Sequence, residues 1–120
     1  MAKNKAMFKK LCNRKSQRFA ALGRKLEKEV AELLEKMQES GLIESFVYNK
    51  PFSEADCQGK DFTVRLSIGD EVVERSFGVT ISYKSWGDSK VKHPDVRQFC
   101  FPIGTKPETI QKRVLELFAS

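Results

Sequence analysis

The chain has 120 residues, of which 22 are Lys or Arg and 16 are Asp or Glu, so its formal net charge is +6. This length fits one ordinary domain, and an apolar content of 40% with nine Phe argues against a wholly disordered chain. No apolar run approaches the roughly 20 residues that cross a bilayer, and the basic N-terminus lacks the apolar stretch of a secretory signal. We therefore expect a cytoplasmic protein without a membrane span, whose three cysteines are free thiols.

The positive charge is concentrated at the N-terminus. Residues 1–26 contain nine basic residues and no acidic one, whereas residues 27–120 hold 13 basic and 16 acidic residues, a net charge of −3. We assign residues 1–15 to a flexible basic arm and residues 16–120 to one domain. Such an arm suits a phosphate backbone or an acidic partner surface, although a solvated tail remains an alternative. The candidate nucleic-acid contacts are Lys9, Lys10, Arg14, Lys15, Arg18 and Arg24.

The first predicted element is an amphipathic helix over residues 16–40. Its apolar residues recur in steps of three and four, which is the period of one helix face. Gly41 follows directly and favours the end of the helix. The apolar positions are Phe19, Leu22, Leu26, Val30, Leu33, Leu34 and Met37.

Three strands are predicted next. Residues 42–48 are apolar and β-branched enough for a strand, residues 49–60 are rich in turn formers, and residues 61–66 alternate strictly between apolar and polar. Ile68 to Glu71 contains Gly69 and predicts a hairpin turn. The returning strand is expected to run from Val72 to Lys84, because Phe77, Val79, Ile81 and Tyr83 again alternate.

The C-terminal part is predicted to form a loop over residues 85–94, a fourth strand over residues 96–101 and a last helix. Thr105 and Glu108 have the spacing of a capping box, with Pro107 in the first turn. The fold class that follows is α+β, with a small mixed β-sheet of about four strands flanked by an N-terminal and a C-terminal helix.

The cysteines and the single histidine give little indication of chemistry. Cys12, Cys57 and Cys100 are far apart and His93 is alone, so no pair has the spacing of zinc ligands. A nucleophilic pair of Cys100 and His93 stays open, although a free cysteine is more often a small buried residue. No glycine-rich nucleotide-binding loop occurs in the sequence.

Two segments carry a resemblance to a known family. Gly59-Lys60-Asp61-Phe62, a hairpin and then Val79-Thr80-Ile81-Ser82-Tyr83-Lys84-Ser85 resemble the PD-(D/E)XK nuclease superfamily. Gly23-Arg24-Lys25-Leu26-Glu27 resembles the helical Gly-x-x-x-Glu of several members, including Holliday-junction-resolvase-like and restriction-enzyme-like proteins. The core of that family has a leading helix, a hairpin that bears an Asp and then an acid-x-Lys, and later a strand and a helix.

The resemblance implies a restriction-endonuclease-like fold and a metal-dependent nuclease site. Asp61 would ligate Mg²⁺, Glu27 would support the metal or its water, and Lys84 would orient or activate the attacking water in phosphodiester hydrolysis. Two features depart from the family pattern. Ser82 stands where the family carries an acid or Gln, and little chain separates Lys84 from Val96 for the helix that the family usually places there.

Each of these residues also has a structural interpretation. Asp61 could simply begin a strand after a glycine turn, Lys84 could be a solvated lysine at a strand end, and Glu27 is one of five acids on its helix. Tyr83 and Trp86 could stack on bases, although aromatic residues near a strand end are more often part of the core.

The sequence thus predicts a nucleic-acid-associated protein of nuclease-like fold that binds DNA through its basic arm. It would be either a Mg²⁺-dependent DNA endonuclease or a catalytically degraded relative, and a homodimer would suit a symmetric substrate. Two alternatives remain open. One is a non-catalytic module resembling the αβββα double-stranded-RNA-binding domain, and the other is a protein–protein adaptor.

Overall fold

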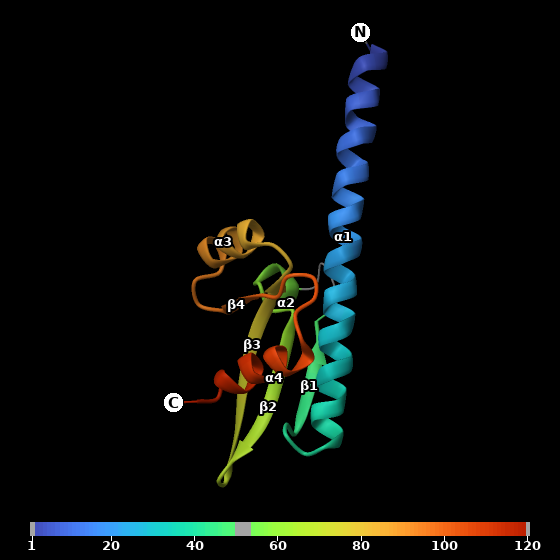
Figure 1. The fold of residues 1–120 in the computed structure, drawn as a ribbon. Helices are drawn as coiled ribbons and strands as arrows, with labels where there is room; N and C mark the ends of the chain where they lie inside the picture. Colours follow the sequence, from blue (N-terminus) through green and yellow to red (C-terminus); the bar gives the residue numbers. More distant parts are fainter. Residues whose placement is uncertain (1, 50–53, 120) are drawn as a thin grey trace.

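The computed structural model describes residues 2–49 and 54–119, with the backbone alone for residues 2–20, 55 and 56. It contains four strands and four helices along the described chain (Figure 1). In chain order the elements are α1 (Ala2–Glu39), β1 (Ser45–Tyr48), α2 (Glu54–Cys57), β2 (Phe62–Ile68), β3 (Glu71–Thr80), α3 (Tyr83–Lys92), β4 (Arg97–Cys100) and α4 (Pro107–Glu116). The α+β class is confirmed.

The four strands form one mixed sheet in the order β1-β2-β3-β4. The first three pair antiparallel, and β4 pairs parallel with β3. The predicted hairpin is present, because Ile68 pairs with Glu71 and Gly69 takes a φ of 62°, which glycine adopts without steric cost. A parallel pair needs a crossover connection, and α3 lies within the one that joins β3 to β4.

The core lies between one face of the sheet and two helices, α1 and α4, which contact each other. Phe62 of β2 and Phe77 of β3 stand directly opposite one another and are fully buried. These two rings belong to a row of five aromatic side chains across the sheet, in which neighbouring ring centroids are 5.0 to 5.5 Å apart. The order is Tyr48, Phe62, Phe77, Phe99 and Phe101. The apolar stripe of α1 and the residues Ile110 and Val114 of α4 close this core, as the predicted flanking helices require.

The helix α1 is much longer than the sequence pattern predicts. It begins at Ala2 rather than near residue 16, so the segment assigned to a flexible arm continues the helix without a break at residue 15. Residues 2–15 contain no Gly or Pro and many good helix formers, which explains the continuation. In Figure 1 the N-terminal half of α1 extends away from the sheet and the other helices, and the chain measures 66 Å along its longest axis against 26 and 22 Å across it.

The prediction for residues 81–94 is wrong. The strand β3 ends at Thr80, and the residues expected to form a strand end and a loop instead form α3. Ser82 is extended (φ −125°, ψ 147°), and its hydroxyl accepts a hydrogen bond from the backbone N–H of Ser85 at 3.1 Å. This N-cap satisfies one of the free donors of the first helical turn. The helix therefore begins at Tyr83 and contains Lys84, instead of following a strand that ends at Lys84.

Two smaller differences concern the loops. The turn-rich segment 49–60 includes the short helix α2, and its residues 50–53 lie outside the described residues. The last helix has Lys106 rather than Thr105 at its N-cap, and no side chain caps it. The Thr105 hydroxyl donates instead to the carbonyl oxygen of Pro102 at 2.6 Å, which stabilises the turn before α4.

Candidate functional site

Glu27 lies on the side of α1 that faces β1 and is half-buried. The hydroxyl of Tyr48 donates a hydrogen bond of 2.6 Å to its Oε2 atom. Tyr48 in turn packs on Phe62 in the core, with the ring centroids 5.0 Å apart. The carboxylate of Glu27 therefore anchors the end of β1 to α1.

Asp61 lies immediately before β2, next to β3. Its backbone N–H donates to the carbonyl oxygen of Phe77 at 2.9 Å, and its Oδ2 atom accepts the backbone N–H of Val79 at 2.7 Å. Asp61 thus extends the pairing of β2 with β3, first through its backbone and then through its carboxylate. Val79 is buried, so its N–H has little access to water in place of this partner.

Lys84 and Ser82 flank the start of α3. Lys84 is exposed in the first turn of that helix, so the expectation that it ends a strand is wrong. Ser82 accepts from the N–H of Ser85 and its hydroxyl lies 2.9 Å from that of Ser85. Ser82, the position for which the resemblance implies a metal-binding acid, therefore caps a helix.

Among the described residues, Asp61 and Glu27 do not belong to a cluster of metal ligands. Among the described residues, no group of three or more His, Cys, Asp or Glu side chains could hold a metal ion. One carboxylate oxygen of Asp61 is bonded to a backbone amide, and one of Glu27 is bonded to a tyrosine. The donor set therefore does not fit the Mg²⁺ that the resemblance implies, because that ion takes oxygen ligands gathered around one point.

The candidate nucleic-acid contacts all fall on α1. Arg24 is exposed. The other five are placed along the helix by its backbone alone: Lys9, Lys10, Arg14, Lys15 and Arg18. Positions 10, 14, 18 and 25 are basic and separated by four, four and seven residues, so they share one side of a helix. At roughly 100° per residue this side is opposite the buried stripe at positions 26, 30, 34 and 37.

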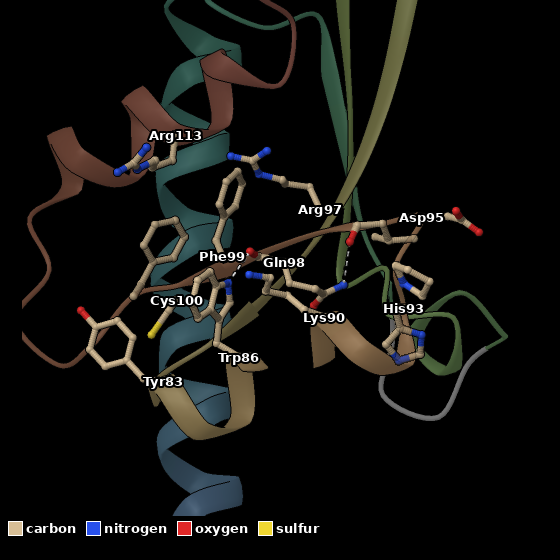
Figure 2. Close-up of a pocket in the computed structure, with 13 residues that line it drawn as sticks. Tyr83, Trp86, Lys90, His93, Asp95, Arg97, Gln98, Phe99, Cys100 and Arg113 are labelled. Atoms are coloured by element: carbon tan, nitrogen blue, oxygen red, sulfur yellow. Dashed lines mark hydrogen bonds between the residues drawn. The ribbon is translucent and has the colours of Figure 1, made fainter. Parts of the chain in front are cut away.

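The sequence analysis missed a cleft that lies over the free edge of β4, between α3 and α4 (Figure 2). Its volume is about 720 Å³, within the range of about 300–1,000 Å³ that is usual for ligand-binding clefts. Figure 2 shows Tyr83 and Trp86 of α3 on one side of β4 and Arg97 and Arg113 on the other. The cleft also includes Cys100.

Two contacts fix the aromatic side of this cleft. Trp86 Nε1 donates to the carbonyl oxygen of Gln98 at 2.7 Å, and Lys90 Nζ lies 4.0 Å from the centroid of the indole ring. The spacing of Trp86 and Lys90 by four residues is a helical signal, which the interpretation of residues 85–94 as a loop concealed. Burial raises the pKa of the Cys100 thiol, and a hydrogen bond with Thr80 partly offsets that rise, so Cys100 is not an activated nucleophile.

Comparisons with known proteins give no relative for this chain: no protein-family model, curated protein or solved structure matches it. Within the part of the chain that the structure describes, no helix is both long enough and apolar enough to span a membrane.

Proposed function

We propose that this chain is a nucleic-acid-binding protein that binds phosphate backbones through the N-terminal half of α1. The observation that carries the proposal is the charge of that segment, nine basic residues and no acid in residues 1–26, on a helix that projects beyond an otherwise acidic domain. Positive charge on a projecting helix attracts phosphate and releases condensed counterions on binding. The acidic remainder would repel the same backbone, so the projection also keeps it at a distance.

The dimensions of the helix suit this role. At 1.5 Å per residue, residues 2–26 of α1 extend over about 37 Å, which is close to one turn of a DNA duplex at about 34–36 Å. Basic positions on one side of such a rod can meet several phosphates along a groove or backbone. Phosphate contacts of this kind set affinity and position but do not read sequence.

We further propose that the fold is related to that of the PD-(D/E)XK nucleases but is not catalytic. The support for the relationship is the element order, in which α1 leads, β1 to β3 form an antiparallel meander, and α3 connects to a parallel β4. The support for lost catalysis is the use of Asp61, Glu27 and Ser82 in hydrogen bonds that hold the fold together. The protein would then be a degraded relative that keeps nucleic-acid binding.

The two alternatives are less well supported. The αβββα order of a double-stranded-RNA-binding domain lacks the parallel strand β4 and the helix α3. A protein–protein adaptor would place the same basic helix against an acidic partner surface, and binding that does not weaken with salt would favour it. We also propose DNA rather than RNA as the nucleic acid, which competition between DNA and RNA duplexes tests. A homodimeric state is a separate proposal, which light scattering tests.

The test compares binding of matched charge variants by fluorescence anisotropy. In the first, Lys9, Lys10, Arg14 and Lys15 are replaced by Gln, and in the control the same change is made at four exposed lysines elsewhere, Lys28, Lys36, Lys106 and Lys112. At about 100 mM salt we expect the first variant to bind duplex DNA roughly 10-fold or more weaker, since several phosphate contacts are lost, and the control to change little. Equal losses in both variants would refute a role for the projecting helix.

Catalysis is tested with the same protein and duplex. We expect no cleavage on incubation with Mg²⁺ or Mn²⁺. Cleavage by the wild-type chain that Asp61→Asn and Glu27→Gln both remove would overturn the proposal that this site has no catalytic role.

A further inference from the structure

The cleft over the free edge of β4 combines aromatic surface with positive charge. Its lining includes Lys90, Arg97 and Arg113 but only one acid, Asp95. This local excess of positive charge contrasts with the net charge of −3 of residues 27–120. Among the described residues Arg113 pairs with Glu116 at 3.0 Å, whereas neither Lys90 nor Arg97 forms an ion pair. Lys90 lies over the Trp86 ring and Arg97 lies 5.7 Å from the centroid of Phe99, but no carboxylate of the described residues neutralises either charge, so both can attract an anionic ligand.

The aromatic side of the cleft is also available. Tyr83 is 70% exposed, so the faces of its ring are accessible to a ligand. Its ring meets the indole of Trp86 edge-on, with centroids 6.4 Å apart. Trp86 cannot turn freely, because its Nε1 is bonded to Gln98 and Lys90 lies over its ring. The planes of the two rings are 81° apart, so a flat ring can stack on the exposed face of Tyr83 while its edge contacts Trp86.

We propose that this cleft binds one nucleotide of a single strand, with an unpaired base against Tyr83 and Trp86 and its phosphate near Arg97 and Lys90. The inference deepens the proposed nucleic-acid binding and rests on it for the choice of partner. Stacking of bases on aromatic side chains beside a basic groove is a general mode of binding single strands. A paired base would not fit, since its faces are covered by its neighbours in the duplex.

An acidic peptide that adds a strand to the edge of β4 is the competing occupant of the same cleft. It is less favoured because Trp86 already occupies the carbonyl oxygen of Gln98, which an added strand would need. The edge strand is also only four residues long. These contacts therefore favour a ring and a phosphate over an extended backbone.

The chain provides its own probe, since Trp86 is its only tryptophan. The full chain is titrated with a single-stranded oligonucleotide, with a duplex of the same sequence, with a mononucleotide and with inorganic phosphate, while Trp86 fluorescence is followed. We expect saturable quenching by the single strand and the mononucleotide, and at most weak quenching by the duplex and by phosphate. Quenching by a poly-glutamate peptide equal to that by the single strand would overturn the assignment.

Three variants locate the ligand. Tyr83→Ala is expected to weaken single-strand binding roughly 10-fold or more. Tyr83→Phe keeps the ring and is expected to bind the single strand as tightly as the wild type. Arg97→Gln is expected to reduce the salt dependence of binding by about one phosphate contact. Arg75→Gln, an exposed arginine on β3 away from the cleft, is the matched control and should behave as the wild type. Identical binding by Tyr83→Ala and wild type would refute the proposal.

The variant with four neutral residues on α1 separates this inference from the proposed function. If that variant binds more weakly but saturating single strand leaves Trp86 fluorescence unchanged, the cleft proposal fails and the role of α1 stands. If Trp86 is quenched by the single strand with the same affinity in both proteins and the variant also binds duplex DNA as tightly as the wild type, the cleft binds nucleotides and the role of α1 is refuted.

Discussion

Replacement of Asp61 by alanine separates a structural role from a catalytic one. The carboxylate accepts the N–H of Val79 at 2.7 Å, and Val79 is buried, so Asp61→Ala leaves a backbone donor without its partner. A hydrogen bond to a charged group contributes about 1.5–3 kcal/mol, and an unsatisfied buried donor costs a similar amount. For a domain of this size, each kcal/mol corresponds to a change in Tm of about 4 °C. We therefore expect Asp61→Ala to lower the Tm by roughly 6–12 °C.

Differential scanning calorimetry, with and without Mg²⁺, is the assay. Asp61→Asn keeps an oxygen acceptor at the same place and should lose less than half as much stability as Asp61→Ala. A ligand that binds only the folded state raises the Tm. Because this account places no Mg²⁺ site at Asp61, Mg²⁺ should leave the Tm of the wild type unchanged. A metal ligand would behave in the opposite way. An unchanged Tm in Asp61→Ala, together with a wild-type Tm that rises with Mg²⁺, would refute this account of the residue.

Three further changes test the local structure. Ser82→Ala removes the cap of α3 and should cost about 1 kcal/mol in urea unfolding; no loss would mean that the cap does not hold this helix. Gly78→Ala should cost about 1–3 kcal/mol, since the added Cβ would lie 2.6 Å from a backbone oxygen, and a variant as stable as wild type would contradict that packing. In a Cys12→Ser background, the exposed Cys57 should be alkylated faster than Cys100 at about pH 8, because a raised pKa leaves less thiolate; faster alkylation of Cys100 would contradict the burial of its thiol.

The strands were the most predictable part of the fold. The alternation of Phe62, Val64 and Leu66 and the glycine at position 69 specify a strand and its turn from local sequence alone, and the register of Ile68 with Glu71 follows from them. The helix α3 was not predicted, because Ile81 and Tyr83 continue the alternation of β3. The N-cap at Ser82 favours a helix over a strand in this segment. It is a single hydrogen bond, which the apolar pattern does not reveal.

The sequence predicted the position of one of the candidate site residues better than that of the others. Asp61 was expected to begin a strand and lies immediately before β2, whereas Ser82 and Lys84 were expected on the paired strand and lie beyond its end at Thr80. Whether the Asp61 carboxylate is free depends on the register of Phe62 with Phe77, which brings the N–H of Val79 within reach. The engagement of Glu27 by Tyr48 likewise depends on how α1 packs on β1. Contacts between residues that are far apart in sequence follow from the packed fold rather than from any local pattern.

The salt dependence of duplex binding tests the central claim most directly. The observed binding constant of the wild type is measured over a range of NaCl concentrations, alongside the variant with Gln at Lys9, Lys10, Arg14 and Lys15. Each phosphate contact contributes about 0.9 to the slope of log K against log salt, so loss of four contacts should reduce the steepness by about 3 to 4. Identical slopes for the two proteins would contradict the account that the projecting half of α1 binds the phosphate backbone.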